Sequence, residues 1–251
     1  MVKMLLVGCN GRMGKVITEL AEADPQIEIT AGVDVAGTCA GQYPVAASFD
    51  EVSAEVDVIV DFSSPAVFDS MLDWALAHTI PVAVCTTGLS EAQIARLDEA
   101  SKKIAVLRSA NMSLGVNLLI KLVREAAQTL ANAGFDIEIV ERHHNQKKDA
   151  PSGTALALAD SINEGLDHAY EYVYDRSNRL QKRDPKEIGI SAVRGGTIPG
   201  THEVIFAGTD EVVELTHLAY SRSIFGKGAI SAAKFLAGKS AKFYSMADVI
   251  G

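Results

Sequence analysis

The chain has 251 residues, 48% of them apolar and 22% charged, and its 32 acidic against 23 basic residues give a net charge of −9. This balance is typical of a globular protein, and the excess of acid argues against a general nucleic-acid-binding or anionic-membrane surface. No apolar run reaches the ~18 residues that a membrane span needs. Three scattered cysteines, and no apolar signal-peptide core after Met1, predict a cytoplasmic protein with reduced thiols.

A glycine-rich turn follows the first predicted strand. Residues 4–7 form a short, continuous apolar run, typical of a strand that is buried on both faces. Three glycines spaced Gly-x-x-Gly-x-x-Gly follow at positions 8, 11 and 14, and a helical pattern begins there. A second predicted strand, 27–33, ends at Asp34, where an acid can bind the adenosine ribose of a dinucleotide. Neither feature is specific alone, but together they predict a dinucleotide site.

Strands and helices alternate from there to residue 107. Further strands are predicted at 56–62, 81–84 and 104–107. Helices are predicted to begin at Ser64-Pro65 and at the capping box of residues 90–93. This alternation predicts a doubly wound parallel sheet that binds ligands at the carboxyl ends of its strands. Thr86, Thr87 and Asn111 follow such ends and are predicted to line a nicotinamide site, although each could simply cap a loop.

Residues 141–154, Glu-Arg-His-His-Asn-Gln-Lys-Lys-Asp-Ala-Pro-Ser-Gly-Thr, concentrate basic side chains in an acidic chain. A strand predicted at 135–140 and a helix predicted at 155–162 make this segment a loop. Ser152 can cap the helix, and the N–H groups of Gly153 and Thr154 would then face an anion. An ordinary solvated loop is one alternative. Zinc is another, but adjacent histidines lack the usual ligand spacing.

The alternation of predicted strands and helices ends after Gly115. A long helix is predicted at 116–133, and strands at 188–193, 202–207 and 212–217 follow one another without helices between them. This order favours a second, α+β domain with a mixed or antiparallel sheet. Residues 194–200 are glycine-rich and join two of these strands as a lid or as a flexible hairpin. A last helix is predicted at 223–236, and its pattern does not decide which domain it joins.

Taken together, these motifs resemble the 4-hydroxy-tetrahydrodipicolinate reductase family, also called dihydrodipicolinate reductase. The resemblance covers nearly the whole chain and includes Gly-x-x-Gly-Arg-Met-Gly, Thr-Thr-Gly at 86–88, the specific segment 141–154 and Arg-Gly-Gly-Thr at 194–197. It implies an α/β fold with two domains. The first is a Rossmann-like, doubly wound parallel-sheet domain at 1–113, completed by 220–251. The second, at 114–219, is an α+β domain with a mixed sheet for substrate binding and tetramerisation.

The resemblance also implies an activity, which is the reduction of a cyclic, unsaturated dicarboxylate by NADH or NADPH in lysine and diaminopimelate synthesis by a homotetramer. His143 is implied as the acid/base histidine and Lys147 as the proton donor, with no metal. The implied substrate-binding residues are His144, Ser152, Gly153 and Thr154. The implied cofactor-binding residues are Gly8, Cys9, Asn10, Gly11, Arg12, Met13, Asp34, Cys85, Thr86, Thr87, Ser109, Ala110, Asn111 and Met112. Two residues depart from the family pattern: Cys85 stands where many relatives have glycine, and Met112 stands where some have phenylalanine.

Two other functions are compatible with a dinucleotide-binding domain. Another small NAD(P)-dependent dehydrogenase would need a catalytic cysteine or a Lys-x-x-x-His pattern in the second domain, and residues 116–219 contain no cysteine. A non-catalytic, dinucleotide-sensing protein would call for a basic DNA-binding module, which the sequence lacks.

The residues after Asp34 predict a preference for NADH over NADPH. Asp34 is followed by Val-Ala-Gly-Thr, and no Lys or Arg occurs again before Arg96. A carboxylate binds ribose hydroxyls but repels a 2′-phosphate, which needs a basic partner. Arg12 and Lys15 are the only nearby cations that could take that part.

Overall fold

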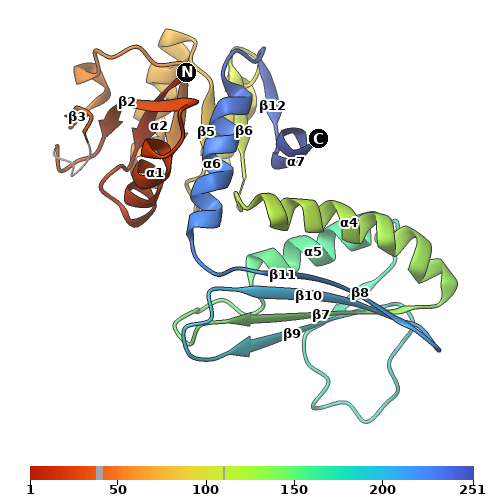
Figure 1. The fold of residues 1–251 in the computed structure, drawn as a ribbon. Helices are drawn as coiled ribbons and strands as arrows, with labels where there is room; N and C mark the ends of the chain where they lie inside the picture. The colour runs from red at the N-terminus through yellow and green to blue at the C-terminus, as the bar shows by residue number, and fades with distance from the viewer. Residues whose placement is uncertain (38–41, 110) are drawn as a thin grey trace. The chain divides into compact units, whose positions relative to one another are not determined.

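The structure is a computed structural model that describes residues 1–37, 42–109 and 111–251. The chain divides into two compact units (Figure 1). The N-terminal unit comprises Met1–Leu114 together with Arg222–Gly251, and the central unit comprises Gly115–Ser221. In the described part of the chain, no helix is both long and apolar enough to cross a membrane.

The N-terminal unit is built on a parallel sheet with the strand order β12-β6-β5-β4-β1-β2-β3. Its strands are β1 (Val2–Val7), β2 (Ile27–Val33), β3 (Val45–Ala46), β4 (Val58–Asp61), β5 (Val82–Val84), β6 (Ala105–Arg108) and β12 (Lys242–Tyr244). Its helices are α1 (Arg12–Glu22), α2 (Pro65–His78), α3 (Glu91–Ala100), α6 (Ser223–Leu236), α7 (Met246–Ile250) and the short η1 (Phe49–Glu51). The predicted doubly wound parallel sheet is confirmed.

Helices cover both faces of this sheet (Figure 1). One apolar cluster joins the sheet to α1 and α6 through residues such as Ile17 and Ile230. A second cluster joins the opposite face to α2 and α3 through Phe68 and Leu97. Because both faces are covered, the strands are apolar without alternation, as the sequence indicated for residues 4–7. Helix α6, which the sequence pattern could not place, belongs to this unit.

The central unit contains a mixed sheet with the order β11-β10-β7-β9-β8. Its strands are β7 (Asp136–His143), β8 (Glu171–Val173), β9 (Glu187–Arg194), β10 (Thr201–Ala207) and β11 (Val212–Leu218). Its helices are α4 (Leu114–Leu130), η2 (Ala131–Ala133) and α5 (Gly153–Glu164). The long helices α4 and α5 lie on one face of the sheet (Figure 1) and share with it a core that includes Val123, Ile139 and Leu158.

One prediction for the central unit is wrong, and one of two alternatives is excluded. Strand β7 runs to His143, so Arg142 and His143 belong to a strand and not to a loop. Burial alternates along the whole strand, and Glu141 and His143 continue the buried face of Ile137 and Ile139 with polar side chains. Residues 194–200 do not form a hairpin, because β9 and β10 lie on opposite sides of β7.

Candidate active site

The carboxyl ends of five neighbouring strands are aligned at one edge of the parallel sheet. Val7 pairs with Val33 and with Asp61, Asp61 pairs with Val84, and Val84 pairs with Arg108. The residues one position beyond this edge are Gly8, Asp34, Phe62, Cys85 and Ser109. The register therefore brings together the four sequence segments in which cofactor-binding residues were predicted. Ala110, also predicted there, and Cys39 lie outside the described residues.

The turn after β1 and the first turn of α1 each require a glycine. Gly8 has a φ of +78°, and a Cβ there would lie 2.7 Å from the carbonyl oxygen of Phe62. A Cβ at Gly14 would lie 2.3 Å from the carbonyl oxygen of Cys9. Helix α1 begins at Arg12, which is exposed, and no side chain caps its first turn. The backbone N–H groups of that turn can therefore bind an anion.

Asp34 is tied to the glycine turn. Its carboxylate accepts hydrogen bonds from the backbone N–H groups of Asn10, at 3.1 Å, and Ala36, at 3.2 Å. The side-chain nitrogen of Asn10 is buried and has no hydrogen-bond partner among the described residues. An unpaired buried donor is costly, so this nitrogen is available to a ligand at the turn.

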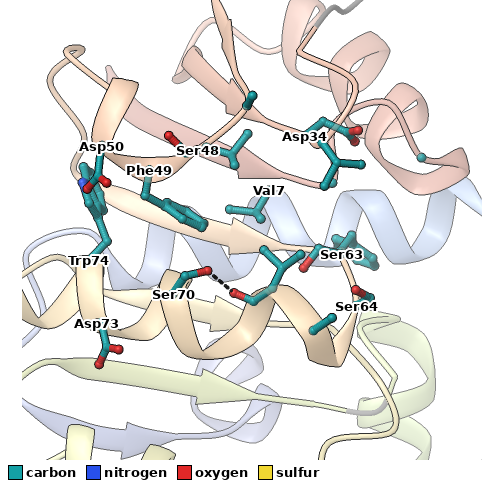
Figure 2. A pocket seen from close by; sticks show the side chains of 18 of the residues that line it. Val7, Asp34, Ser48, Phe49, Asp50, Ser63, Ser64, Ser70, Asp73 and Trp74 are labelled. Atoms are coloured by element: carbon teal, nitrogen blue, oxygen red, sulfur yellow. Dashed lines mark hydrogen bonds between the residues drawn. The ribbon is translucent and has the colours of Figure 1, made fainter.

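A pocket of about 830 Å³ opens beside this turn. Asp34 and the two serines that follow β4, Ser63 and Ser64, lie at one end of it, and Asp50 and Trp74 lie at the other (Figure 2). Gly8 and Gly11 also line it. Among the described residues that line the pocket there is no lysine or arginine. Ser64 was predicted only as the start of a helix and Ser63 was not singled out, although both follow a strand at the same edge.

The other predicted cofactor residues are divided between the surface and the core. Thr87 is exposed, whereas Cys85 and Met112 are buried in the apolar cluster beside α6. Thr86 is buried beside Asp61, a carboxylate at the end of β4 that the sequence analysis did not single out. Burial raises the pKa of Asp61, although hydrogen bonds from the backbone N–H and the hydroxyl of Ser63 oppose this shift.

In the central unit, Glu141 is at the centre of a buried polar network. The side chain of Glu141 is 0% exposed and accepts hydrogen bonds on both oxygens. One oxygen receives the backbone N–H of Ser152, at 2.9 Å, and Arg194, at 2.7 Å. The other receives His143 Nδ1, at 2.6 Å, and Arg194, at 2.7 Å. Burial alone would raise the pKa of Glu141, but these donors hold it below its ordinary value.

Two histidine rings lie next to this carboxylate. His143 is 8% exposed and His202, on β10, is 4% exposed. Their ring centroids are 5.1 Å apart, in an edge-to-face arrangement. Burial lowers the pKa of His143, and Glu141 only partly offsets that effect. Burial also lowers the pKa of His202 to about 4. Both imidazoles are therefore neutral at neutral pH, unlike solvated basic side chains.

The loop after β7 brings Lys147 and the start of α5 to one carboxylate. Lys147 Nζ lies 2.9 Å from Asp149 Oδ2, and the backbone N–H of Gly153 also helps to lower the pKa of the Asp149 carboxyl group. The Lys147 hydrogen bond is the main reason why the pKa of Asp149 lies below its usual range. Ser152 Oγ accepts from the N–H of Ala155, which confirms Ser152 as the helix cap, and lies 3.0 Å from His202 Nε2.

Not every residue of the basic segment belongs to this cluster. Arg142 lies on the other face of the sheet and pairs with Glu203, at 2.7 Å. His144 is half-buried. Glu141, Arg194 and His202 were not predicted as site residues, and Glu141 and Arg194 are 53 positions apart. Among the described residues, no group of three His, Cys, Asp or Glu side chains could hold a metal ion.

Comparison with known proteins identifies the family. Residues 2–112 match the model for the N-terminus of dihydrodipicolinate reductase, and residues 115–250 match the model for its C-terminus. The 4-hydroxy-tetrahydrodipicolinate reductase of Caldanaerobacter subterraneus subsp. tengcongensis is 52% identical over 250 residues, which cover 100% of this chain and 98% of that protein. The corresponding enzyme of Clostridium tetani is 45% identical, over 98% of this chain and 96% of its own length.

A solved structure shows the same fold. The dipicolinate-bound dihydrodipicolinate reductase of Paenisporosarcina sp. TG-14 matches with a TM-score of 0.82 at 22% identity, over 98% of this chain and 97% of that one. Both family models match, and together they cover nearly all 251 residues. The chain therefore belongs to the dihydrodipicolinate reductase family.

Proposed function

We propose that the protein reduces 4-hydroxy-tetrahydrodipicolinate to tetrahydrodipicolinate with NADH or NADPH, a step in lysine and diaminopimelate synthesis. Family membership supports the reaction class, and the relatives that are 41–52% identical carry the name of this enzyme. The observation that carries the proposal is the neighbouring pair of His143, which contacts Glu141, and Lys147, which pairs with Asp149 at the start of α5. We place the reaction in the cytoplasm, where soluble biosynthetic enzymes draw on reduced nicotinamide.

The N-terminal unit fits a nicotinamide dinucleotide. The uncapped start of α1 and the turn at Gly8 would hold the pyrophosphate, which needs a close approach of backbone N–H groups. Asp34 would bind the adenosine ribose, and the buried side-chain nitrogen of Asn10 offers a further donor. We assign the ends of β5 and β6, including Thr87 and Asn111, to the nicotinamide end of the cofactor. The bound cofactor would supply the hydride.

The central unit fits a dicarboxylate. Lys147 pairs with Asp149, and both Lys147 and the Gly153 N–H stabilise the ionised form of that carboxylate, so they can act on a single carboxylate group. A substrate carboxylate that takes the place of Asp149 would keep both interactions. His144 precedes these donors in the sequence and Thr154 follows them. We assign both residues to the same carboxylate-binding site.

The same residues can supply the proton. Hydride transfer to a conjugated ring builds negative charge that must be neutralised, and a positioned donor lowers that barrier. The ammonium group of Lys147 can donate this proton and stabilise the charge as it develops. The neutral ring of His143 can accept or relay a proton at Nε2, because its Nδ1 is engaged by Glu141.

Turnover can be measured directly. The purified protein is mixed with NADH or NADPH and with the product of dihydrodipicolinate synthase, and loss of the reduced nicotinamide absorbance is followed. We expect oxidation that depends on the synthase product and stops when the synthase is omitted. No oxidation of either cofactor under these conditions would contradict the proposed activity.

The pocket supports a preference for NADH. Asp34, Asp50 and Asp73 contribute carboxylates to its lining, and none of the described lining residues is a lysine or arginine. We expect kcat/KM for NADH to exceed that for NADPH at least tenfold, which corresponds to ~1.4 kcal/mol of repulsion at the 2′-phosphate. Comparing kcat/KM for the two cofactors measures this ratio.

A substitution beside Asp34 tests the cause. The side chain of Val35 is 86% exposed, so Val35→Arg can extend into solvent next to the ribose site. Val35→Arg should narrow the gap between the cofactors, because it gives a 2′-phosphate a cationic partner. Val35→Gln, which has similar reach without charge, should leave the gap unchanged. If kcat/KM of the wild-type protein is equal for the two cofactors, or higher for NADPH, then Arg12 or Lys15 reaches the 2′-phosphate.

We also propose a homotetramer assembled through the sheet of the central unit. Alternation along the strands places Val193, Ile205 and Leu218 on the face opposite to α4 and α5. No helix of the described central unit covers this face, and β11 is an edge strand. Exposed apolar side chains and strand edges are features that association covers.

Sedimentation at micromolar concentration should show four copies. Leu218→Arg should shift the protein towards smaller species, because a charge is costly to bury at an apolar contact. Leu118→Arg, on helix α4, is the matched control, since the two leucines are 49% and 47% exposed. A wild-type monomer, or equal effects of both substitutions, would count against this assembly.

A further inference from the structure

Two side chains, Glu141 and Arg194, form a hydrogen-bonded chain on the Nδ1 side of His143. Neither has a role in the proposed reaction. Glu141, two residues earlier on β7, faces the Nδ1 side of the ring at 2.6 Å. Arg194, at the end of β9, donates to both oxygens of that carboxylate at 2.7 Å. The parallel register pairs His143 with Arg194, which sets this arrangement. The three side chains therefore come from one corner of the sheet.

The donors around Glu141 fix which ring nitrogen of His143 carries hydrogen. Ser152 N–H and the guanidinium of Arg194 are permanent donors, and an ionised carboxylate only accepts. The third partner, Nδ1, must therefore carry a hydrogen to bond to that carboxylate. The Nε2 atom is left as the nitrogen that exchanges a proton with a bound molecule.

The guanidinium also controls the effect of the carboxylate on the ring. A lone buried carboxylate would stabilise the imidazolium form of a neighbouring histidine. Here the pKa of His143 lies below its ordinary value, because burial and the positive charges of Lys147 and Arg194 outweigh Glu141. The titratable or charged groups around the ring are Glu141 on β7, Arg194 on β9, His202 on β10 and Lys147 in the loop after β7. From α5, the neighbouring cap residue Ser152 is uncharged.

We propose that Glu141 and Arg194 are a positioning pair for His143. The carboxylate fixes the Nδ1–H form of the ring, and the guanidinium cancels the carboxylate's charge so that the ring stays neutral before substrate binds. This inference rests on the proposed function only for the catalytic use of His143. The positioning itself is a property of the unliganded protein and can be measured without turnover.

The charge effect can be tested by NMR of the full-length, unliganded protein labelled with ¹⁵N-histidine. In Arg194→Met, the pH at which His143 changes charge should rise by about one to two pH units. Arg194→Lys keeps the charge and should stay close to the wild-type value. Arg124→Met is the matched control, because Arg124 also pairs with a glutamate in this unit, Glu164, but on helices α4 and α5. An unchanged His143 titration in Arg194→Met would overturn the inference.

The role of the carboxylate has a separate signature. In Glu141→Gln, both oxygen positions still face donors, and Nδ1 of His143 is the one donor that can become an acceptor. The amide nitrogen should therefore turn to Nδ1 and switch the neutral ring to the Nε2–H form, which ¹⁵N shifts distinguish. A ring that keeps the Nδ1–H form in this variant contradicts the tautomer assignment. Thermal melting of each variant identifies any that does not fold. If Glu141→Gln does not fold, the comparison of the His143 titration in Arg194→Lys and Arg194→Met still tests the proposal.

The pH dependence of activity distinguishes the positioning role of Glu141 and Arg194 from the catalytic role of His143. If His143 acts in the reaction, the limb of the kcat/KM–pH profile that reports it should move upward in Arg194→Met by the same amount as the NMR titration. An NMR shift without a shift of the profile would support the positioning pair and overturn the catalytic role of His143. Arg124→Met should leave both measurements unchanged.

Discussion

Alanine at His143 or at Lys147 is expected to lower kcat by about 10²–10⁴, the range over which a positioned proton donor acts. Binding of the cofactor should remain largely unchanged, because both residues lie in the central unit, whereas the pocket that we assign to the dinucleotide is lined by residues of the N-terminal unit. The measurements are steady-state kinetics and the fluorescence change of the reduced cofactor on binding. Loss of cofactor affinity in step with kcat would indicate misfolding instead.

A neighbouring lysine provides the control for this prediction. Lys148 follows Lys147 directly and is exposed, so Lys148→Ala removes the same charge from the same loop without removing the proposed donor. We expect Lys148→Ala to retain nearly full turnover. If His143→Ala and Lys147→Ala both turn over at wild-type rates, the proton comes from elsewhere.

Valine at Gly153 is expected to abolish competitive inhibition by pyridine-2,6-dicarboxylate. A Cβ at Gly153 would meet nothing within 4 Å, so the protein can accommodate the larger side chain. The side chain would instead crowd the N–H groups at the start of α5, where we place a carboxylate of the substrate. The inhibition constant, measured against the dicarboxylate substrate, reports the loss.

The control for this change is a valine at another helix start. Ala92 is exposed in the first turn of α3, and Ala92→Val adds a branched side chain there without touching the central unit. Inhibition should be unchanged in that variant. Undiminished inhibition in Gly153→Val would show that the carboxylate is held by other residues.

The sequence predicts the N-terminal unit well because its strands and helices follow apolar patterns. Residues 27–33 and 223–236 form a strand and a helix over the predicted bounds. The capping box at Ser90 and Gln93 is confirmed, since each side chain bonds the other's backbone N–H. Ser64 stands at the cap position of α2 but makes no side-chain capping bond there. Short local motifs therefore identify where elements begin more reliably than which bonds they form.

The buried polar network could not be predicted in the same way. Glu141 and His143 occupy the helix-covered face of β7, where apolar residues are expected, so hydrophobicity ends the strand too early. Arg194 meets Glu141 only because β7 and β9 pair in one register, and a sequence does not state that register. The segment 141–154 could be recognised as a candidate site, but its partners on β9 and β10 could not.

The parallel sheet has a consequence for synthesis of the chain on the ribosome. Strand β12, at 242–244, pairs with β6, whereas the central unit is continuous and ends at Ser221. The central unit thus emerges whole and can fold while β6 still has an open edge, and an open edge is exposed to mispairing in a nascent chain. A premature stop at codon 242 would remove β12 and α7. Loss of this late segment would therefore destabilise the unit whose other strands were translated first.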